Sequence, residues 1–300
     1  MSEISEFLIR RYGPAGGRGR PTIEQIERYW TAFRPYADRN FVQEFCTDNP
    51  EAYQQRYWEL FLGAAMIGQG LRLRPNNGQG PDISFSMGER TVWVEAISPG
   101  PGTGNNRVPE MVFHEEGTAL PADGQDVPAR QTLLRYTAAI EEKVRKYRDY
   151  RRDEIVLPTD PFVIALDTSQ LGIFGFHGIS TFPAVLEAVY PVGAMQVHFP
   201  LGGNNRAVKT DLQHRPSVLN ANAAEIVTTR FLDVAYEGVS GILCSSRDDG
   251  TLTPPIPIIF VHNKLAANPI YPSPIQVDEE YRLEDVPNGY QILVTRPDQA

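Results

Sequence analysis

A long amphipathic helix that leads into a short, uninterrupted apolar strand constrains the fold more than any other feature of this sequence. Residues 128–152 repeat apolar side chains at helical spacing, with a stripe formed by Leu133, Ile140, Val144 and Tyr147. Residues 162–166 are then all apolar, which is typical of a parallel strand buried on both faces. Because a helix commonly connects two parallel strands, the pattern predicts an α/β fold.

A β-hairpin is predicted before this helix. Residues 82–87 and 90–98 have strand character and flank Gly88-Glu89, a two-residue turn with glycine first. Facing residues in such a hairpin have numbers that sum to 177, so Asp82 is expected opposite Glu95. Facing side chains lie on the same side of the sheet, with Cβ atoms about 4.5–5.5 Å apart.

The remaining segments predict one α/β domain with a C-terminal elaboration. Asn49-Pro50 signals the start of a helix over residues 51–68, and this helix carries Glu59 beside its apolar stripe. Further strands are expected at 194–199, 241–244 and 256–261, and a helix at 223–237. We divide the chain into an N-terminal arm and helical segment (1–50), a core (51–170) and a C-terminal elaboration (171–300), which packs on the same sheet or forms a second layer.

Charge and composition exclude several classes of protein. The net charge of −9 argues against a simple nucleic-acid coat, although residues 143–152 carry a local charge of +5. Neither cysteine has the spacing of a disulfide framework or a zinc site. The N-terminus lacks an apolar signal region and no run of eighteen apolar residues occurs, so a cytoplasmic protein without a membrane span is expected.

The facing carboxylates predict a metal site. Two like charges opposite each other destabilise a hairpin unless a cation neutralises them, and Glu95 lies within an otherwise apolar strand. Mg²⁺ and Mn²⁺ prefer oxygen ligands, and Mg²⁺ is often held by one or two carboxylates together with substrate phosphate oxygens. A solvent-exposed hairpin bearing two ordinary carboxylates is the alternative.

The order of these elements resembles the PD-(D/E)XK nuclease superfamily, which has the restriction-endonuclease-like fold. The resemblance covers residues 51–167: a helix with Glu59, then Pro81-Asp82, then Glu95 in an apolar strand, then a helix and a buried strand. It implies a mixed central sheet flanked by helices, with Asp82 and Glu95 as metal ligands and Glu59 as a third acidic member. The whole chain also resembles uncharacterised bacterial members of that superfamily.

One position departs from the family pattern. The superfamily places a lysine two residues after the glutamate, where this chain has Ile97. Some members of the superfamily supply this positive side chain from the following helix instead. Lys143 lies about 60° from the centre of the apolar stripe on that helix, closer than Lys146 at about 120°. Lys143 is therefore the candidate for the displaced catalytic lysine.

The resemblance implies a metal-dependent hydrolase of phosphodiester bonds, with DNA as the preferred substrate and RNA as the alternative. The basic residues of the same helix would contact the nucleic-acid backbone without sequence preference: Arg145, Lys146, Arg148, Arg151 and Arg152. Because Ile97 replaces the usual lysine, an inactive fold that binds nucleic acid or protein is the main rival, and a glycosidase using Asp82 and Glu95 is a second. The C-terminal elaboration could recognise a target or form a homodimer.

Overall fold

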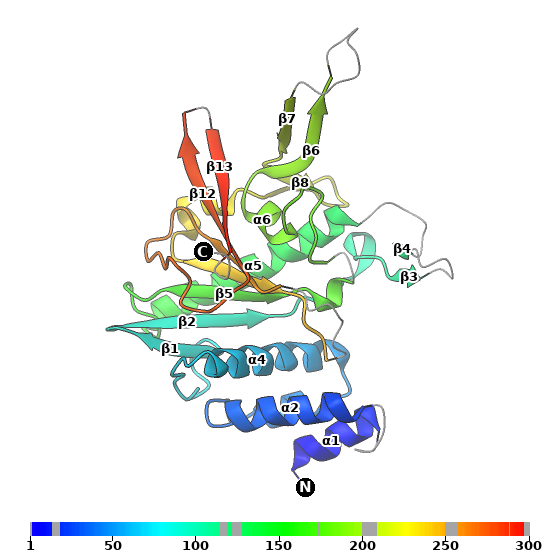
Figure 1. Cartoon of the computed structure of the whole chain (residues 1–300), viewed down its shortest axis with the longest axis vertical. Coiled ribbons are helices and arrows are strands. Elements are labelled where there is room, and N and C mark those ends of the chain that lie inside the picture. Colours follow the sequence, from blue (N-terminus) through cyan, green and yellow to red (C-terminus); the bar gives the residue numbers. More distant parts are fainter. Residues whose placement is uncertain are drawn as a thin grey trace.

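The computed structural model describes residues 2–13, 19–113, 119–121, 128–172, 175–199, 209–249, 257–287 and 289–296. Within these residues the chain folds around one mixed seven-stranded sheet flanked by helices (Figure 1). In spatial order the strands are β1 (Ile83–Met87), β2 (Arg90–Ile97), β5 (Phe162–Asp167), β10 (Gly241–Ser245), β11 (Ile259–His262), β12 (Glu279–Val286) and β13 (Gly289–Thr295).

The sheet combines both strand directions. Strands β2, β5 and β10 run parallel to one another, whereas β1–β2, β10–β11 and β12–β13 are antiparallel pairs and β11–β12 is a parallel pair. The strands of the C-terminal segment therefore extend the sheet that residues 83–167 begin. The α/β class and the central mixed sheet predicted from the sequence are both present.

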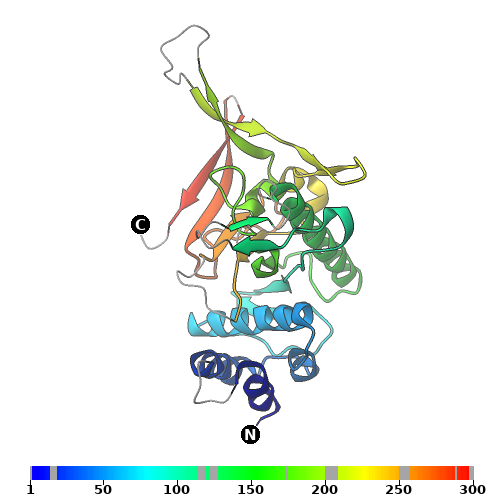
Figure 2. The same cartoon turned by 90° about the vertical axis from the view of Figure 1, so that its right-hand side faces the viewer.

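Helices cover both faces of the sheet. One face is covered by α1 (Glu3–Tyr12), α2 (Arg20–Phe33), α3 (Phe41–Phe45) and α4 (Pro50–Gly68), and the other by α5 (Ala129–Arg152) and α6 (Ala184–Val189) (Figures 1 and 2). Side chains of β5 alternate between the two cores: Ile164 joins the α5 side and Ala165 the α4 side. Both cores meet in this strand, which is why its sequence is continuously apolar.

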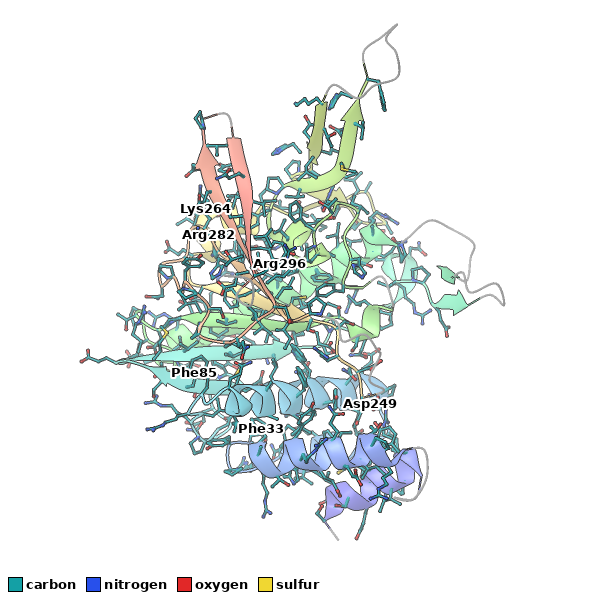
Figure 3. All side chains as sticks on the ribbon, in the orientation of Figure 1. Phe33, Phe85, Asp249, Lys264, Arg282 and Arg296 are labelled. Carbon is teal, nitrogen blue, oxygen red and sulfur yellow. The ribbon has the colours of Figure 1, made fainter. Side chains whose placement is uncertain are left out.

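Local sequence features explain how the helices on the α4 side of the sheet begin and pack together. The Asn49 side chain accepts hydrogen bonds from the amides of Glu51 and Ala52, and Pro50 occupies the first turn, so α4 begins where the sequence predicts. Gly63 lets α2 approach, because a Cβ atom there would lie 2.1 Å from the ring of Phe33. Figure 3 shows Phe33 between these helices.

In the part of the chain that the structure describes, three two-stranded antiparallel sheets lie outside the central sheet. They are β3 (Met111–Phe113) with β4 (Ala119–Pro121), β6 (Val192–His198) with β7 (Lys209–His214), and β8 (Ser217–Leu219) with β9 (Glu225–Val227). The β6–β7 hairpin projects from the body of the molecule (Figure 2). One-turn 3₁₀ helices span Gly104–Asn106, Ser169–Leu171, Arg230–Leu232 and Val234–Tyr236.

The helix predicted over residues 223–237 is wrong. This segment contains β9 and two 3₁₀ turns, and the side chain of Asp233 accepts a hydrogen bond from the amide of Ala235 at the second turn. The β-branched run from Ile226 to Thr229 favours extended backbone over helix. The other predicted C-terminal strands correspond to β6, β10 and β11, although residue 256 lies outside the described residues.

Candidate active site

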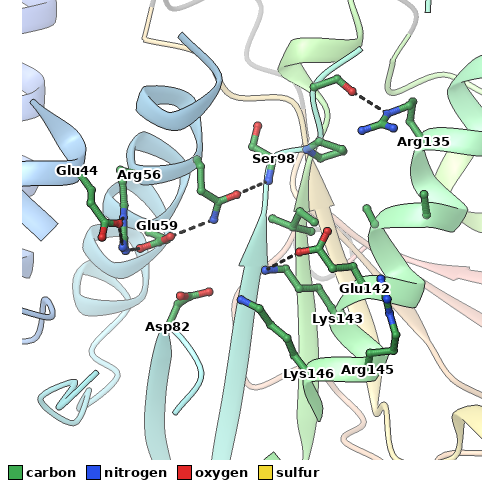
Figure 4. A pocket seen from close by; sticks show the side chains of 16 residues that line it. Glu44, Arg56, Glu59, Asp82, Ser98, Arg135, Glu142, Lys143, Arg145 and Lys146 are labelled. Atoms are coloured by element: carbon green, nitrogen blue, oxygen red, sulfur yellow. Dashed lines mark hydrogen bonds and ion pairs between the residues drawn. The ribbon is translucent and has the colours of Figure 1, made fainter. Parts of the chain in front are cut away.

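Glu59, Asp82 and Lys143 line a pocket of about 580 Å³ at the edge of the sheet, between α4 and α5 (Figure 4). Glu95 does not belong to the lining, but its carboxylate contacts Lys143. Pairing between β1 and β2 begins at Ile83 and Val94, so β2 continues past the end of its partner and leaves an open edge. Both sides of the pocket carry charges of both signs: Glu59 and Arg56 lie on α4, and Glu142 lies on α5 among basic side chains (Figure 4).

The hairpin has the register predicted from its turn. Ile83 faces Val94 and Met87 faces Arg90, and Gly88 has a φ of +61°, as the first position of this tight turn requires. Asp82 immediately precedes β1, at the level of Glu95. The amide of Ala96 donates to Oδ2 of Asp82 over 2.7 Å, so the carboxylate satisfies a donor that β1 does not reach.

Asp82 is buried close to two other carboxylates. Burial raises the pKa of its carboxyl well above the usual value, and the negative charges of Glu95 and Glu59 raise it further. Lys143 and the amide of Ala96 act in the opposite direction without cancelling the shift. In Figure 4 the Asp82 carboxylate points into the pocket toward Glu59. A cation is the group that would relieve this repulsion.

Glu95 is held by three donors from α5. Its Oε1 lies 3.0 Å from Nζ of Lys143 and 3.0 Å from Nζ of Lys146, and Oε2 accepts a 3.2 Å hydrogen bond from the hydroxyl of Tyr150. The Lys143 side chain is only 5% exposed, whereas that of Lys146 is 47% exposed. Burial would lower the pKa of Lys146, but the Glu95 carboxylate outweighs this effect and raises it.

Lys143 thus reaches the glutamate from the helix that follows the hairpin. Ile97, at the family's usual lysine position, is 7% exposed and packs in the α5-side core, although it also borders the pocket. Of the α5 stripe predicted from the sequence, Leu133, Ile140 and Val144 are buried and Tyr147 is partly buried, and Lys143 is buried beside them.

Glu59 is bound by its own helix. Its carboxylate accepts hydrogen bonds from Gln55 Nε2 at 3.0 Å and Arg56 Nη1 at 2.5 Å. Burial raises the pKa of Glu59, and the positive charge of Arg56 opposes that shift. Across the described ranges, no three His, Cys, Asp or Glu side chains converge in a way that could hold a metal ion. Glu59 therefore does not complete a three-carboxylate cage with Asp82 and Glu95.

Sequence reasoning missed several residues of the pocket. Gln55 connects α4 to β2, since its amide nitrogen donates to the carbonyl of Ala96 and its oxygen accepts from the amide of Ser98. Arg135 donates to the carbonyl of Gly100 and lines the pocket, and Tyr150 binds Glu95. One feature of the sequence could have identified Gln55: it lies four residues before Glu59, so the two side chains share a helix face.

The five basic residues of α5 that were predicted to contact nucleic acid have different surroundings. Arg145 and Lys146 line the pocket. Arg148 and Arg151 instead donate to the backbone carbonyls of Ala235 and Val156. Arg152 forms ion pairs with two neighbouring aspartates. Two of the five basic residues predicted to contact the nucleic-acid backbone therefore line the pocket, and the other three have partners within the protein.

Comparisons of the chain with protein-family models, with curated proteins and with solved structures gave no match. Among the described residues, the helices are too short or too polar to cross a membrane.

Proposed function

We propose that this protein is a divalent-metal-dependent nuclease with a restriction-endonuclease-like core, in which Lys143 replaces the lysine usually carried by the glutamate's strand. The observation that carries the proposal is the 3.0 Å contact between Lys143 Nζ and Glu95 Oε1, with both side chains buried beside Asp82. The order α4, β1, β2, α5, β5 and the parallel pairing of β2 with β5 also agree with that core.

The donor set fits an open metal site with two carboxylates. Asp82 and Glu95 are close enough for the negative charge of Glu95 to raise the pKa of Asp82. Mg²⁺ commonly retains several waters beside one or two carboxylates. Lys146 is the half-exposed partner of Glu95, so its departure into solvent would leave Oε1 with one lysine contact, that of Lys143, and make room beside it for a cation. A bound divalent cation would supply a low-pKa water and positive charge for the phosphate.

The protein groups have separate tasks in this proposal. Lys143 places a positive charge beside the reacting phosphate, where it stabilises charge that develops in the transition state. Gln55 fixes the distance between α4 and the open edge of β2 through its bonds to Ala96 and Ser98. Arg135 and Arg145 line the same pocket and attract the phosphate backbone.

Replacing Lys143 tests the proposal. We expect the wild type to cleave DNA with Mg²⁺ or Mn²⁺, and Lys143→Met to lose about 100-fold or more in rate while it still binds Mn²⁺ in calorimetry. Lys146→Met should stay within about tenfold, because Lys143 remains, and Lys209→Met, in the distant β7 strand, is the matched control. Full cleavage by Lys143→Met would refute the displaced lysine.

Arg145 and Arg152 differ in their surroundings, and this difference provides a second prediction, on the binding of DNA. Arg145→Ala should weaken DNA binding and reduce the slope of log affinity against log salt concentration by about 1, because one phosphate contact is lost. Arg152→Ala should change neither quantity, since Asp149 and Asp153 already neutralise this side chain. Fluorescence anisotropy in EDTA at several salt concentrations measures both. Equal effects of the two substitutions would contradict the assignment.

An inactive binding protein is the second candidate, and the ion pairs of Glu95 favour it. Both lysines and Tyr150 satisfy this carboxylate without a metal ion. Metal binding by the wild type without cleavage of any single- or double-stranded substrate would support this candidate. Absence of metal binding would overturn the proposed metal site itself.

A further inference from the structure

A second pocket of about 410 Å³ adjoins the candidate active site. It lies where the 102–106 loop, α5 and the β8–β9 hairpin meet. The amide of Ala221 donates to Oδ1 of Asn106 over 2.7 Å, which fixes the loop against the hairpin. Its volume is within the range of sites that hold small organic groups.

The two pockets share a wall. Arg135 and Ala138 on α5 line both of them. Lys143 and Arg135 are separated by eight residues of one helix, which corresponds to about 12 Å along its axis. A chain of phosphates that passes Lys143 can therefore continue past Arg135 and reach the second pocket.

Arg230 gives the second pocket a charged, incompletely paired wall. This side chain is buried, with 7% of the residue exposed, and it lines the pocket. Its Nη1 donates to the carbonyl of Val227, whereas its buried Nε has no hydrogen-bond partner among the described residues. Because Arg230 lines the pocket, its positive charge would stabilise an anionic acceptor group that entered beside it.

The rest of the lining is mixed in character. Leu134 and Ile226 provide apolar surface, and Asn220 and Thr103 provide polar groups. Glu141 also lines the pocket, but its carboxylate accepts a 2.6 Å hydrogen bond from Tyr236. Apolar surface for a ring, amides for its edges and two guanidinium groups for phosphate are what a nucleotide requires.

We infer that the second pocket binds one nucleotide of a single-stranded nucleic acid, a few nucleotides from the phosphate at Lys143. The inference rests on the proposed function and gives it a substrate class. A base enters such a pocket only when it is unstacked and unpaired, which costs a duplex energy but costs a single strand little. The protein should therefore prefer single strands, or frayed ends, to intact duplex.

Binding without metal tests this inference. A labelled single strand of about eight nucleotides, as DNA and as RNA, and a duplex of the same sequence are titrated with the full chain in EDTA by anisotropy. We expect tighter binding of the single strand. Thr103→Glu, which places a negative charge at the exposed rim of the pocket, should weaken single-strand binding about tenfold and duplex binding far less. Arg230→Gln should have the same effect.

The matched control is Thr31→Glu, the same substitution at an exposed position of α2 on the opposite side of the sheet. If Arg230→Gln fails to fold, Thr103→Glu decides alone. Unchanged single-strand binding by Thr103→Glu, or an equal loss on duplex, would overturn the inference. If the pocket variants lose single-strand binding and the wild type cleaves no substrate, the nucleotide pocket is supported and the nuclease proposal is refuted. If the wild type cleaves nucleic acid and the pocket variants bind single strands normally, the nuclease proposal is supported and the nucleotide pocket is refuted.

Discussion

Asp82→Asn should abolish metal-dependent cleavage and yet stabilise the folded protein. The proposed ligand is lost, so we expect cleavage to fall by more than about 100-fold. The folded state should gain stability, because the substitution removes one of three carboxylates that repel one another. The amide oxygen of Asn can still accept the hydrogen bond from the amide of Ala96. A rise in Tm of about 2 °C or more is expected.

The gain from Asp82→Asn should depend on pH in a defined direction. The pKa of Asp82 is raised in the folded state, so ionisation of this carboxyl disfavours folding. The protonated carboxyl contributes stability that is fully present below the unfolded pKa of about 4 and is lost as the pH rises through the folded-state pKa. The variant and the wild type should therefore have equal stability near pH 4 and diverge above it. Urea denaturation across that range measures the difference, and a constant difference would contradict this explanation.

Glu95→Ala should destabilise the protein by about 3–5 kcal/mol, because the buried ammonium group of Lys143 loses its buried carboxylate partner and keeps a more distant, half-exposed one, that of Glu142. Lys146 contributes less to this cost, since its half-exposed side chain can turn to water. Chemical denaturation at neutral pH measures the loss. Glu44→Ala is the matched control: its ion pair with Arg56 has a half-exposed carboxylate, and removing it should cost no more than about 1 kcal/mol.

A double-mutant cycle separates the ion pair from general damage to the core. The variant Glu95→Ala/Lys143→Met should be more stable than Glu95→Ala alone, by on the order of 2 kcal/mol, because it also removes the buried charge that has lost its buried partner. A double variant less stable than Glu95→Ala would show that packing, and not the buried charge, determines the loss.

Local patterns predicted the elements that build the site. Gly88-Glu89 fixed the hairpin register, and therefore the placement of Asp82 level with Glu95, because a two-residue loop allows one alignment. The stripe on α5 placed Lys143 at the edge of the buried surface, because helical geometry is regular over its 24 residues. Both inferences use only the periodicity of one element or one turn.

Contacts between distant elements could not be read from the sequence. Gln55 bonds to Ala96 and Ser98, about forty residues away, and nothing near Gln55 indicates which strand edge is open. The second lysine on Glu95 was missed because Lys146, judged by its angle on the helix, looked too far from the buried face. A long, flexible side chain reaches across that angle.

The position of β5 in the sheet has a consequence for the order in which the chain can fold during synthesis. This strand lies between β2 and β10, and β10 follows it by more than seventy residues. Until residues 241–245 leave the ribosome, β5 has one unpaired edge and an apolar surface, the kind of edge that promotes association between chains. The candidate site therefore rests on a sheet whose central pairing is completed only late in translation, and residues 51–170 alone would retain that open edge.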